Sequence, residues 1–349
     1  MRAAVIRAFG GPDALRIEEV EDPVLAAGEV LVRVRAVTVN RSLDIDVRRD
    51  GARRGVVLPH VPGVDPVGIV VAVADDVDGV EVGEHVAVAP TIRCGACDFC
   101  TAGKESQCPN SRHIGVHRWG GYAELVTAPA RNIIRIPDGL GSAEAAVILR
   151  HAPTALNLLQ SLAQVQPGET VLVMGATGGL GAAGVQVAKL LGATVIAGAG
   201  AKDRVAAAVA NGADHGIDYR AGDLTAEVEA LTDGRGVDVV FENISDPVLW
   251  PRAFASIAYG GRMVTAGAHG GGKVELDVRR LYGRRIRIIG GAGATRADNA
   301  AILDAALAGR VSARIDRVMP LDAAADAHRL FEEGVSLVGK VVLEVGPSS

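Results

Sequence analysis

The chain has 349 residues, 49% hydrophobic and 22% charged, a composition typical of a globular protein with room for two domains. Its formal charge of -5 is spread along the sequence, so neither a nucleic acid nor an anionic membrane is expected as a partner. The apolar start at residues 3–6 is too short for a signal peptide, and no run of about 18 apolar residues occurs. A soluble, cytoplasmic protein is therefore expected.

Residues 1–135 are predicted to be rich in short strands. The stretch 28–39 alternates in polarity and is dominated by valine, and 67–73 and 84–88 are further strand candidates. Glycine and proline break the pattern between them. Because no long helix occurs here, an irregular barrel or sandwich is predicted.

The period changes from about Pro137. A helix is predicted over 142–160, interrupted near Pro153. An apolar run at 171–174 is then followed by the glycine turn GATGGLG at 175–181, a helical pattern, and a second apolar run at 194–197. Strand, glycine turn, helix and strand form a βαβ unit whose glycines permit close approach to a pyrophosphate. The alternative is a glycine-rich contact between helix and sheet with no ligand.

Strands and helices alternate after this unit. Strands are predicted at 215–219, 237–241, 262–266 and 286–290, and helices at 203–211, 224–231 and 248–258. Six strands alternating with helices predict a doubly wound parallel sheet. Later helices are predicted at 298–308, with Asp298 as N-cap, and at 323–331. A final strand at 339–345 is expected to return to the first domain.

All four cysteines lie close together, at Cys94, Cys97, Cys100 and Cys108, with the spacing C-x2-C-x2-C-x7-C. Four thiolates at this spacing can surround one Zn²⁺ tetrahedrally and leave no open position, which predicts a structural zinc. The alternative is an empty or disulfide-bonded lobe.

Several segments resemble the medium-chain dehydrogenase/reductase superfamily in order and spacing, namely QPGETVLV, GATGGLG, GADHGIDYR, GVDVVFENISD, GGRMVTAGA and VGKVVLEV. The segments VELDVRRLYGRRIRIIGG and AHRLFEEGVSLVGKVVLEV look most like its quinone oxidoreductase-like, NADPH-dependent branch. The resemblance implies a GroES-like catalytic domain (1–135 and 312–349, with a structural-zinc lobe at 91–110) and a Rossmann domain (136–311). It also implies a cleft between them for the nicotinamide.

The resemblance also shows where a catalytic zinc would be bound. The first ligand column falls at Asn40 or Arg41, the G-H-E motif reads Gly63-Val64-Asp65, and the third column falls near Arg150 and His151. An open zinc site needs about three protein ligands. Because that set is missing, no catalytic zinc is expected.

The cofactor prediction depends on the end of the second Rossmann strand. NAD-dependent domains usually place a carboxylate there for the ribose 2′-OH, and this chain has Ala199. Lys202 and Arg204 follow and can pair with a 2′-phosphate, and by resemblance Tyr219 packs near it. NADP(H) is therefore predicted; the alternative is that Lys202 and Arg204 are ordinary surface charges.

By the same resemblance, further positions contact the cofactor. Asn243, Gly267 and Ala268 are expected near the nicotinamide ribose and ring, and Lys340 is expected to reach the cofactor from the first domain. The pyrophosphate is expected at the turn residues Gly175, Thr177, Gly178, Gly179 and Leu180.

Without a Lewis-acid metal, an acceptor conjugated to a carbonyl is easier to reduce than a simple ketone. Hydride transfer to a quinone or an activated C=C bond is therefore predicted, with Asn40, Asp44 and Thr154 as cleft residues by resemblance. Asn40 and Thr154 are hydrogen-bond donors, whereas Asp44 is an anchor. A zinc-free alcohol dehydrogenase or carbonyl reductase, and a non-catalytic NADPH-binding protein, are the alternatives.

The stretch 285–290 is expected to be the edge strand of the Rossmann sheet. Its isoleucines Ile286, Ile288 and Ile289 invite pairing with a second chain. In the resembling family this edge joins two sheets, so a homodimer or a dimer of dimers is predicted.

Overall fold

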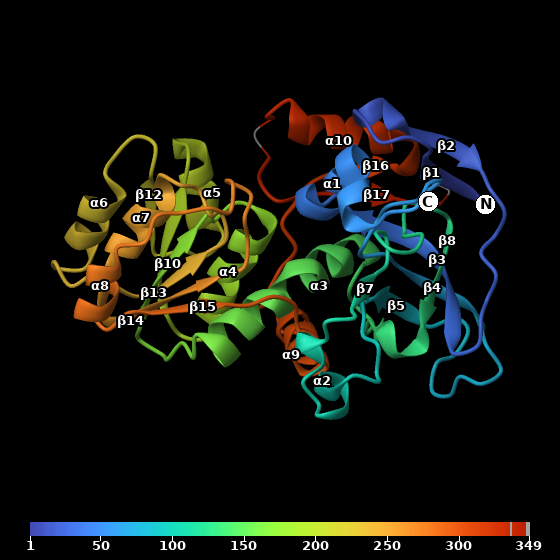
Figure 1. The fold of residues 1–349 in the computed structure, drawn as a ribbon, viewed down its shortest axis with the longest axis horizontal. Coiled ribbons are helices and arrows are strands. Elements are labelled where there is room, and N and C mark those ends of the chain that lie inside the picture. Colours follow the sequence, from blue (N-terminus) through green and yellow to red (C-terminus); the bar gives the residue numbers. More distant parts are fainter. Residues whose placement is uncertain (336, 347–349) are drawn as a thin grey trace. The chain divides into compact units, whose positions relative to one another are not determined.

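The computed structural model describes residues 1–335 and 337–346. The chain folds into two compact units (Figure 1). Unit 1 comprises Met1–Arg150, Ile315–Ser336 and Lys340–Ser349. Unit 2 comprises His151–Arg314 and Leu337–Gly339. Helix α3 (Ser142–Leu156) contains the boundary between them.

Unit 1 is built on a sheet in the order β16-β17-β3-β4-β5-β9, with β8 paired to β3. All its pairs are antiparallel except β16 with β17. The strands are β3 (Glu29–Thr38), β4 (Val67–Val73), β5 (His85–Val88), β8 (Leu125–Pro129), β9 (Ile133–Arg135), β16 (Ile315–Pro320) and β17 (Lys340–Glu344). β3 buries Val30, Val32 and Val34 and exposes the intervening Arg33 and Arg35, as its alternation predicts.

The rest of unit 1 consists of short elements around this sheet. They are the hairpin β1 (Arg2–Ile6) and β2 (Leu15–Glu19), the lobe strands β6 (Thr91–Ile92) and β7 (Arg112–His113), and the helices α1 (Asp46–Asp50), α2 (Asp98–Thr101) and α10 (Ala324–Glu332). A π-helical stretch, Arg41–Ile45, begins after Val39 and Asn40, which follow β3, and leads directly into α1. The prediction that the final strand returns to the first domain is confirmed, because β17 pairs with β3.

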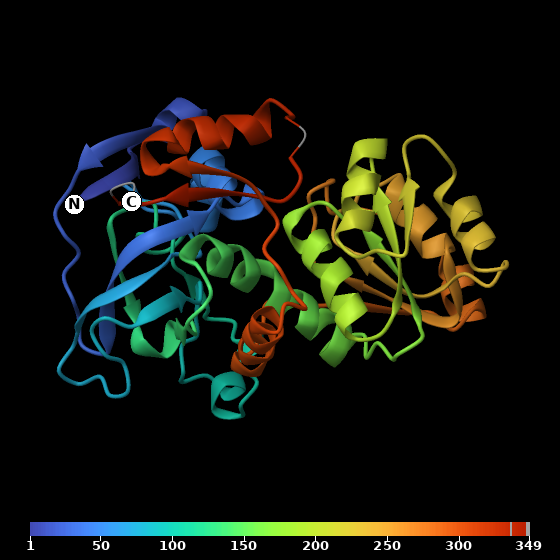
Figure 2. The ribbon, with the colours of Figure 1, turned by 180° about the vertical axis from the view of Figure 1, so that it is seen from behind.

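Unit 2 holds a six-stranded parallel sheet in the order β12-β11-β10-β13-β14-β15. Its strands are β10 (Thr170–Met174), β11 (Thr194–Ala199), β12 (His215–Asp218), β13 (Val237–Glu242), β14 (Ile257–Thr265) and β15 (Arg287–Gly290). Helices α4 (Gly179–Leu190) and α5 (Lys202–Ala210) cover one face, and α6 (Leu224–Leu231) and α7 (Leu249–Ala255) cover the other (Figures 1 and 2). This confirms the predicted doubly wound sheet.

One buried cluster of unit 2 lies on the α6–α7 face of the sheet. Leu172, Ile196, Val240 and Met263 come from four different strands and pack with Phe254 of α7. The helices α8 (Val278–Gly283) and α9 (Arg296–Leu307) complete the unit. β15 is an edge strand, as predicted.

Three local predictions differ from the structure. Helix α3 continues through Pro153 to Leu156, and the irregular part is the π-helical stretch Asn157–Leu162 that follows it. The N-cap of α9 is Thr295, and Asp298 forms the other half of a capping box with it. Strand β14 begins at Ile257, before residue 262 where the strand was predicted to begin. Strand β16 was not predicted at all.

Within the described residues, none of the helices combines the length and the apolar character that crossing a membrane requires.

Candidate active site and cofactor-binding residues

The predicted glycine turn joins β10 to α4. Gly175 has a φ of +62°, and a Cβ on Gly181 would lie 2.1 Å from the carbonyl oxygen of Gly175, so both positions require glycine. No side chain caps the N-terminus of α4. Its first backbone N–H groups are therefore oriented to donate to an anion, which fits the pyrophosphate of a dinucleotide.

The residues expected around the nicotinamide lie close to this turn, because they follow the carboxyl ends of the neighbouring strands β13 and β14. Asn243 follows β13 and donates from Nδ2 to the carbonyl oxygen of Met174 at the end of β10. A Cβ on Gly267, after β14, would lie 2.1 Å from the carbonyl oxygen of Asn243. Parallel sheets bind ligands at this edge. Of the remaining predicted residues here, Thr177 is buried and Gly178 and Ala268 are exposed.

The end of β11 carries the residues that were predicted to select the cofactor. Ala199 ends the strand, and Lys202, exposed, begins α5. A Cβ on the intervening Gly200 would lie 3.0 Å from the Tyr219 ring and 3.1 Å from Nε of Arg220. Sequence reasoning did not assign Arg220, although it directly follows Tyr219.

Electrostatics place Arg204 in the same neighbourhood. Burial raises the pKa of Tyr219, while the charges of Arg220 and Arg204 act to lower it. The charges of Asp218 and Asp246 also act on Tyr219 and raise its pKa. The end of β11 is thus close to Tyr219 and Arg220, and the strand itself ends on Ala199 and carries no carboxylate there.

The four cysteines form a compact cluster in unit 1. Their four sulfur atoms all lie within 4.8 Å of one another, and three of the Sγ–Sγ distances are 3.5, 3.8 and 3.9 Å. A tetrahedron with Zn–S bonds of about 2.3 Å has edges of about 3.8 Å, so the cluster has the size of a Cys₄ zinc site. No disulfide joins these thiols. The cluster could hold a structural zinc, as its spacing predicts.

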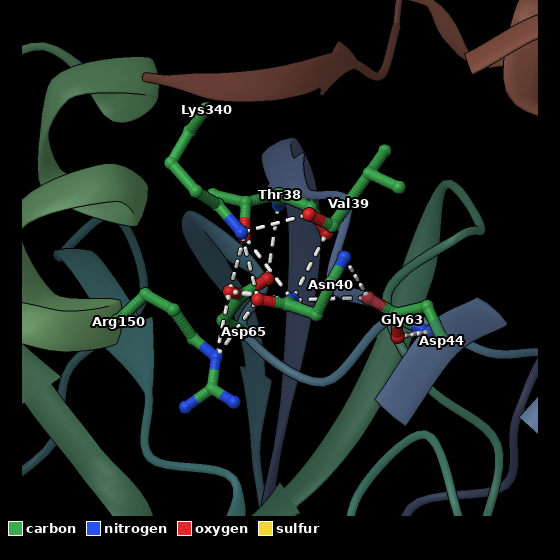
Figure 3. Close-up of polar contacts among 8 residues, drawn as sticks. All are labelled: Thr38, Val39, Asn40, Asp44, Gly63, Asp65, Arg150 and Lys340. Carbon is green, nitrogen blue, oxygen red and sulfur yellow. Dashed lines mark hydrogen bonds and ion pairs between the residues drawn. The ribbon is translucent and has the colours of Figure 1, made fainter. Parts of the chain in front are cut away.

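A second group of polar residues meets in unit 1, and we call Thr38, Asn40, Asp44, Asp65, Arg150 and Lys340 the polar cluster (Figure 3). All of them are buried except Arg150, which is half-buried. Asn40 is the second residue after β3, Asp44 lies in the π-helical stretch, and Asp65 precedes β4. Arg150 comes from α3 and Lys340 begins β17. Segments far apart in the sequence thus meet at one end of β3.

Asn40 is the centre of the polar cluster. Its Oδ1 accepts from Lys340 Nζ at 2.8 Å and from Arg150 Nε at 3.1 Å. Its Nδ2 group donates to Asp44 Oδ2 at 3.0 Å and to Asp65 Oδ2 at 3.1 Å. Both ends of the amide are therefore used, and its orientation is fixed by charged groups on either side.

The two carboxylates are held by further donors. Asp65 accepts from the backbone N–H of Thr38 at 2.9 Å and from its hydroxyl at 2.5 Å, and lies 3.5 Å from Arg150 Nε. Asp44 accepts from the backbone N–H groups of Asn40 at 2.8 Å and of Gly63 at 3.0 Å. Lys340 also donates to the carbonyl oxygen of Val39 at 2.7 Å.

Burial changes how these groups titrate. Burial, reinforced by the charge of Asp65, raises the pKa of Asp44 to about 7, although hydrogen bonds from Asn40 oppose the change. Burial also lowers the pKa of Lys340 to about 8, against the attraction of Asp65 and Asp44. Near neutral pH the polar cluster can therefore hold or release a proton.

The structure brings together only part of the predicted catalytic set. Asn40 and Asp44 both belong to the polar cluster, and Thr154 is half-buried on the part of α3 that belongs to unit 2. Lys340 is buried within the polar cluster. Asp65 and Arg150 received no role from the sequence, although both stand in columns that carry zinc-site residues in the resembling enzymes.

Comparison with known proteins agrees with this architecture. Residues 26–138 match the model of the alcohol dehydrogenase GroES-like domain, and residues 179–308 match that of a zinc-binding dehydrogenase. An NAD-dependent alcohol dehydrogenase of Sulfolobus acidocaldarius is 30% identical, over 99% of this chain and 100% of the relative. Human quinone oxidoreductase is 27% identical over 98% and 97% of the two chains.

Among solved structures, one described as an NAD-dependent alcohol dehydrogenase superposes with a TM-score of 0.92 at 38% identity, over 99% of this chain and 100% of that chain. Fold, glycine turn and matches together define an oxidoreductase with a GroES-like domain and a Rossmann domain that binds NAD or NADP. The chain belongs to the medium-chain dehydrogenase/reductase superfamily.

Proposed function

We propose that the protein is an NADPH-dependent oxidoreductase that transfers a hydride to a quinone or to a C=C bond conjugated with a carbonyl group, without a catalytic metal. The polar cluster is the observation that carries this proposal. By the resemblance, the first zinc-ligand column falls at Asn40 or Arg41, Val64 occupies the histidine position, and Arg150 and His151 stand near the third column. A valine, an amide held by four charged groups and a guanidinium do not form the donor set of an open zinc site.

The proposed class of acceptor follows from how the product anion can be stabilised without a metal ion. A metal ion stabilises the alkoxide of a simple ketone strongly, whereas a conjugated acceptor spreads the added charge over several atoms. Hydrogen-bond donors then suffice to stabilise the product anion. When bound, a dihydronicotinamide supplies the hydride. Thr154 is proposed to donate from its hydroxyl to the product anion. The amide of Asn40 is used within the polar cluster, so Asn40 is proposed to orient that cluster.

NADPH is proposed as the cofactor because of the residues around the end of β11. Ala199 offers no acceptor for a ribose 2′-OH, and Arg204, Arg220 and Lys202 supply positive charge for a 2′-phosphate. The names of several relatives state NAD dependence, so both cofactors belong in the test. One structural zinc per chain, bound by the four cysteines, is part of the proposal.

A screen of NADPH and NADH oxidation tests the proposal. The acceptors are a quinone, an enone, an enoyl thioester and a saturated ketone. We expect turnover of at least one of the first three with NADPH, at a kcat/KM well above that for the ketone.

The second candidate is a carbonyl reductase or alcohol dehydrogenase that works without zinc, which the names of the alcohol dehydrogenase relatives favour. Preferential turnover of the saturated ketone, or of an alcohol with the oxidised cofactor, would support it and contradict the first proposal. Tight NADPH binding without turnover of any acceptor would instead support a non-catalytic protein.

A further inference from the structure

Arg150 is anchored at one end of its guanidinium group and open at the other. Its Nε donates to Asn40 Oδ1 and faces Asp65 Oδ2. Neither terminal nitrogen has a hydrogen-bond partner within residues 1–335 and 337–346, and both point away from the other residues drawn in Figure 3. The Arg150 side chain is 19% exposed, in contrast to the buried residues that hold its Nε.

The anchor holds the guanidinium in one orientation. Asn40 cannot rotate without losing Lys340 on one side and Asp44 on the other. Asp65 is fixed independently by the backbone and hydroxyl of Thr38. Donors that are oriented before a reaction stabilise a developing charge without reorganisation, and a planar guanidinium presents two of its N–H groups side by side.

The charge around Arg150 suits an anion. With Asp44 protonated, the polar cluster contains two cations, Arg150 and Lys340, and one carboxylate, so it carries one excess positive charge. The nearby His113 responds to the same field: burial is the main cause that lowers its pKa to about 4, and repulsion by its neighbours His117, Arg93, Arg150 and Arg54 adds to it. One negative charge placed at the open end of Arg150 would balance the polar cluster.

We propose that the terminal nitrogens of Arg150 bind the carbonyl oxygen of the acceptor and stabilise the negative charge that forms on it during hydride addition. This rests on the proposed function and names the group that takes over from a metal ion. A C–H bond forms at the β-carbon with the hydride of the dihydronicotinamide, which is thereby oxidised. The electron pair of the C=C bond moves to give an enolate, and water protonates the α-carbon. Arg150 keeps its protons throughout, and Asn40 and Asp65 are its positioning residues.

The first test compares Arg150→Gln and Arg150→Lys with the wild type, using whichever acceptor the wild type reduces. Removing an oriented donor to an oxyanion lowers kcat by a factor of about 100 to 1000, and we expect that loss for Arg150→Gln. Arg150→Lys keeps the positive charge but loses the paired N–H donors of the guanidinium. Its kcat should therefore lie between those of Arg150→Gln and the wild type. Arg16→Gln, an exposed arginine on β2, is the matched control and should have no effect. The Kd of NADPH should stay unchanged in every variant.

A loss of NADPH affinity equal to the loss of rate would overturn the proposal, because Arg150 would then be a cofactor ligand. Chemical rescue separates a direct role from a structural one. Added ethylguanidinium should restore activity to Arg150→Ala, whereas ethylammonium should not. If ethylguanidinium does not restore activity to Arg150→Ala, although the circular dichroism spectrum and Tm of the variant are unchanged, that result also counts against the proposal.

A binding measurement makes the test independent of turnover. Para-nitrophenolate mimics an enolate oxygen, and its absorbance reports its ionisation. With the oxidised cofactor present, we expect the wild type to bind this anion at least about tenfold more tightly than Arg150→Gln. Equal binding by both proteins overturns the assignment of Arg150. If the wild type reduces only saturated ketones, the proposed function fails while this comparison still decides the role of Arg150.

Discussion

Lys340, at the start of the last strand, donates from Nζ to Oδ1 of Asn40 over 2.8 Å, although 300 positions separate them in the sequence. The antiparallel pairing of β17 with β3 creates this contact, because it places Lys340 beside the segment that follows β3. The lysine that was expected to reach the cofactor is thus, in unit 1, a buried ammonium group. Burial lowers its pKa to about 8, and the charge of Asp65 is the main influence that opposes this change.

The raised pKa of Asp44 makes stability depend on pH in a defined window. Because the folded-state pKa of about 7 lies above the unfolded value of 3.8, folding binds a proton between these limits. The stabilisation is complete below about pH 4 and is lost as the pH rises to about 7, at up to about 1.4 kcal/mol per unit. Asp44→Asn removes this dependence.

Urea unfolding of the wild type and of Asp44→Asn at pH 5, 6, 7 and 8 checks this prediction. Subtracting the two free energies of unfolding cancels the other titrating groups. We expect the advantage of the wild type to decrease by about 2 to 3 kcal/mol between pH 5 and pH 8. Asp13→Asn, an exposed carboxylate, should show no such trend. A difference that stays constant with pH would mean that Asp44 is already ionised at pH 5.

Most of the fold could be predicted because its signals are local. Alternation predicted β3, and the apolar runs on either side of the glycine turn, with the helical pattern after it, predicted β10, α4 and β11. The end of α3 was not predictable, since a proline within a helix normally interrupts it, and here neighbouring packing maintains the helix through Pro153. Strand β16 was missed because it is largely exposed and has no apolar alternation.

The parts of the candidate sites that lie within one segment could be predicted from the sequence. The parts that form where distant segments meet could not. The cysteines lie within one lobe, so their spacing was sufficient. The polar cluster depends on the pairing of β17 with β3 and on the packing of α3, and no local pattern encodes either. Neither Asp65 nor Arg150 completes a set of metal ligands, so the pattern of the resembling family assigns them no function in this sequence. The close approach of Arg220 to Gly200 is likewise a property of the folded sheet.

The cysteine cluster predicts a defined metal content. We expect about one zinc per chain in protein purified without added metal, measured by elemental analysis. Cys97→Ser should lose most of this zinc and lower the Tm, because three ligands leave the site open. Ser111→Ala, in the same lobe but not a ligand, should retain it. Two zinc ions per chain would contradict a site without catalytic metal, and none would contradict the assignment of the lobe.

The edge strand β15 predicts self-association. Its backbone edge is unpaired within unit 2, Ile288 is 36% exposed, and the preceding α8 exposes Val278 and Tyr282. Pairing with the same strand of a second chain covers both the edge and these side chains. We expect a dimer or a dimer of dimers in light scattering at micromolar concentration. Ile288→Lys should shift it toward monomer, whereas Val318→Lys, on the edge strand β16 of the other sheet, should not. A wild-type monomer would contradict the prediction.

The surroundings of Gly200 predict how the enzyme distinguishes its cofactors. A charge-assisted contact contributes roughly 1.5 to 3 kcal/mol when well formed, and less when it stays hydrated. Two partly exposed contacts to a 2′-phosphate therefore give NADPH a preference on the order of 10- to 1000-fold over NADH. Arg204→Ala and Arg220→Ala should each weaken NADPH and leave NADH nearly unchanged, because NADH has no phosphate there.

The converse change is Ala199→Asp, which places a carboxylate at the end of β11. It should repel the 2′-phosphate and offer the ribose of NADH an acceptor, so that the preference decreases or reverses. The measurement is kcat/KM for both cofactors with one quinone, in the wild type and the three variants, with Arg252→Ala on α7 as the control. If Arg204→Ala and Arg220→Ala lower kcat/KM equally with both cofactors, these arginines serve the fold of unit 2, and the proposed choice of NADPH loses its main support.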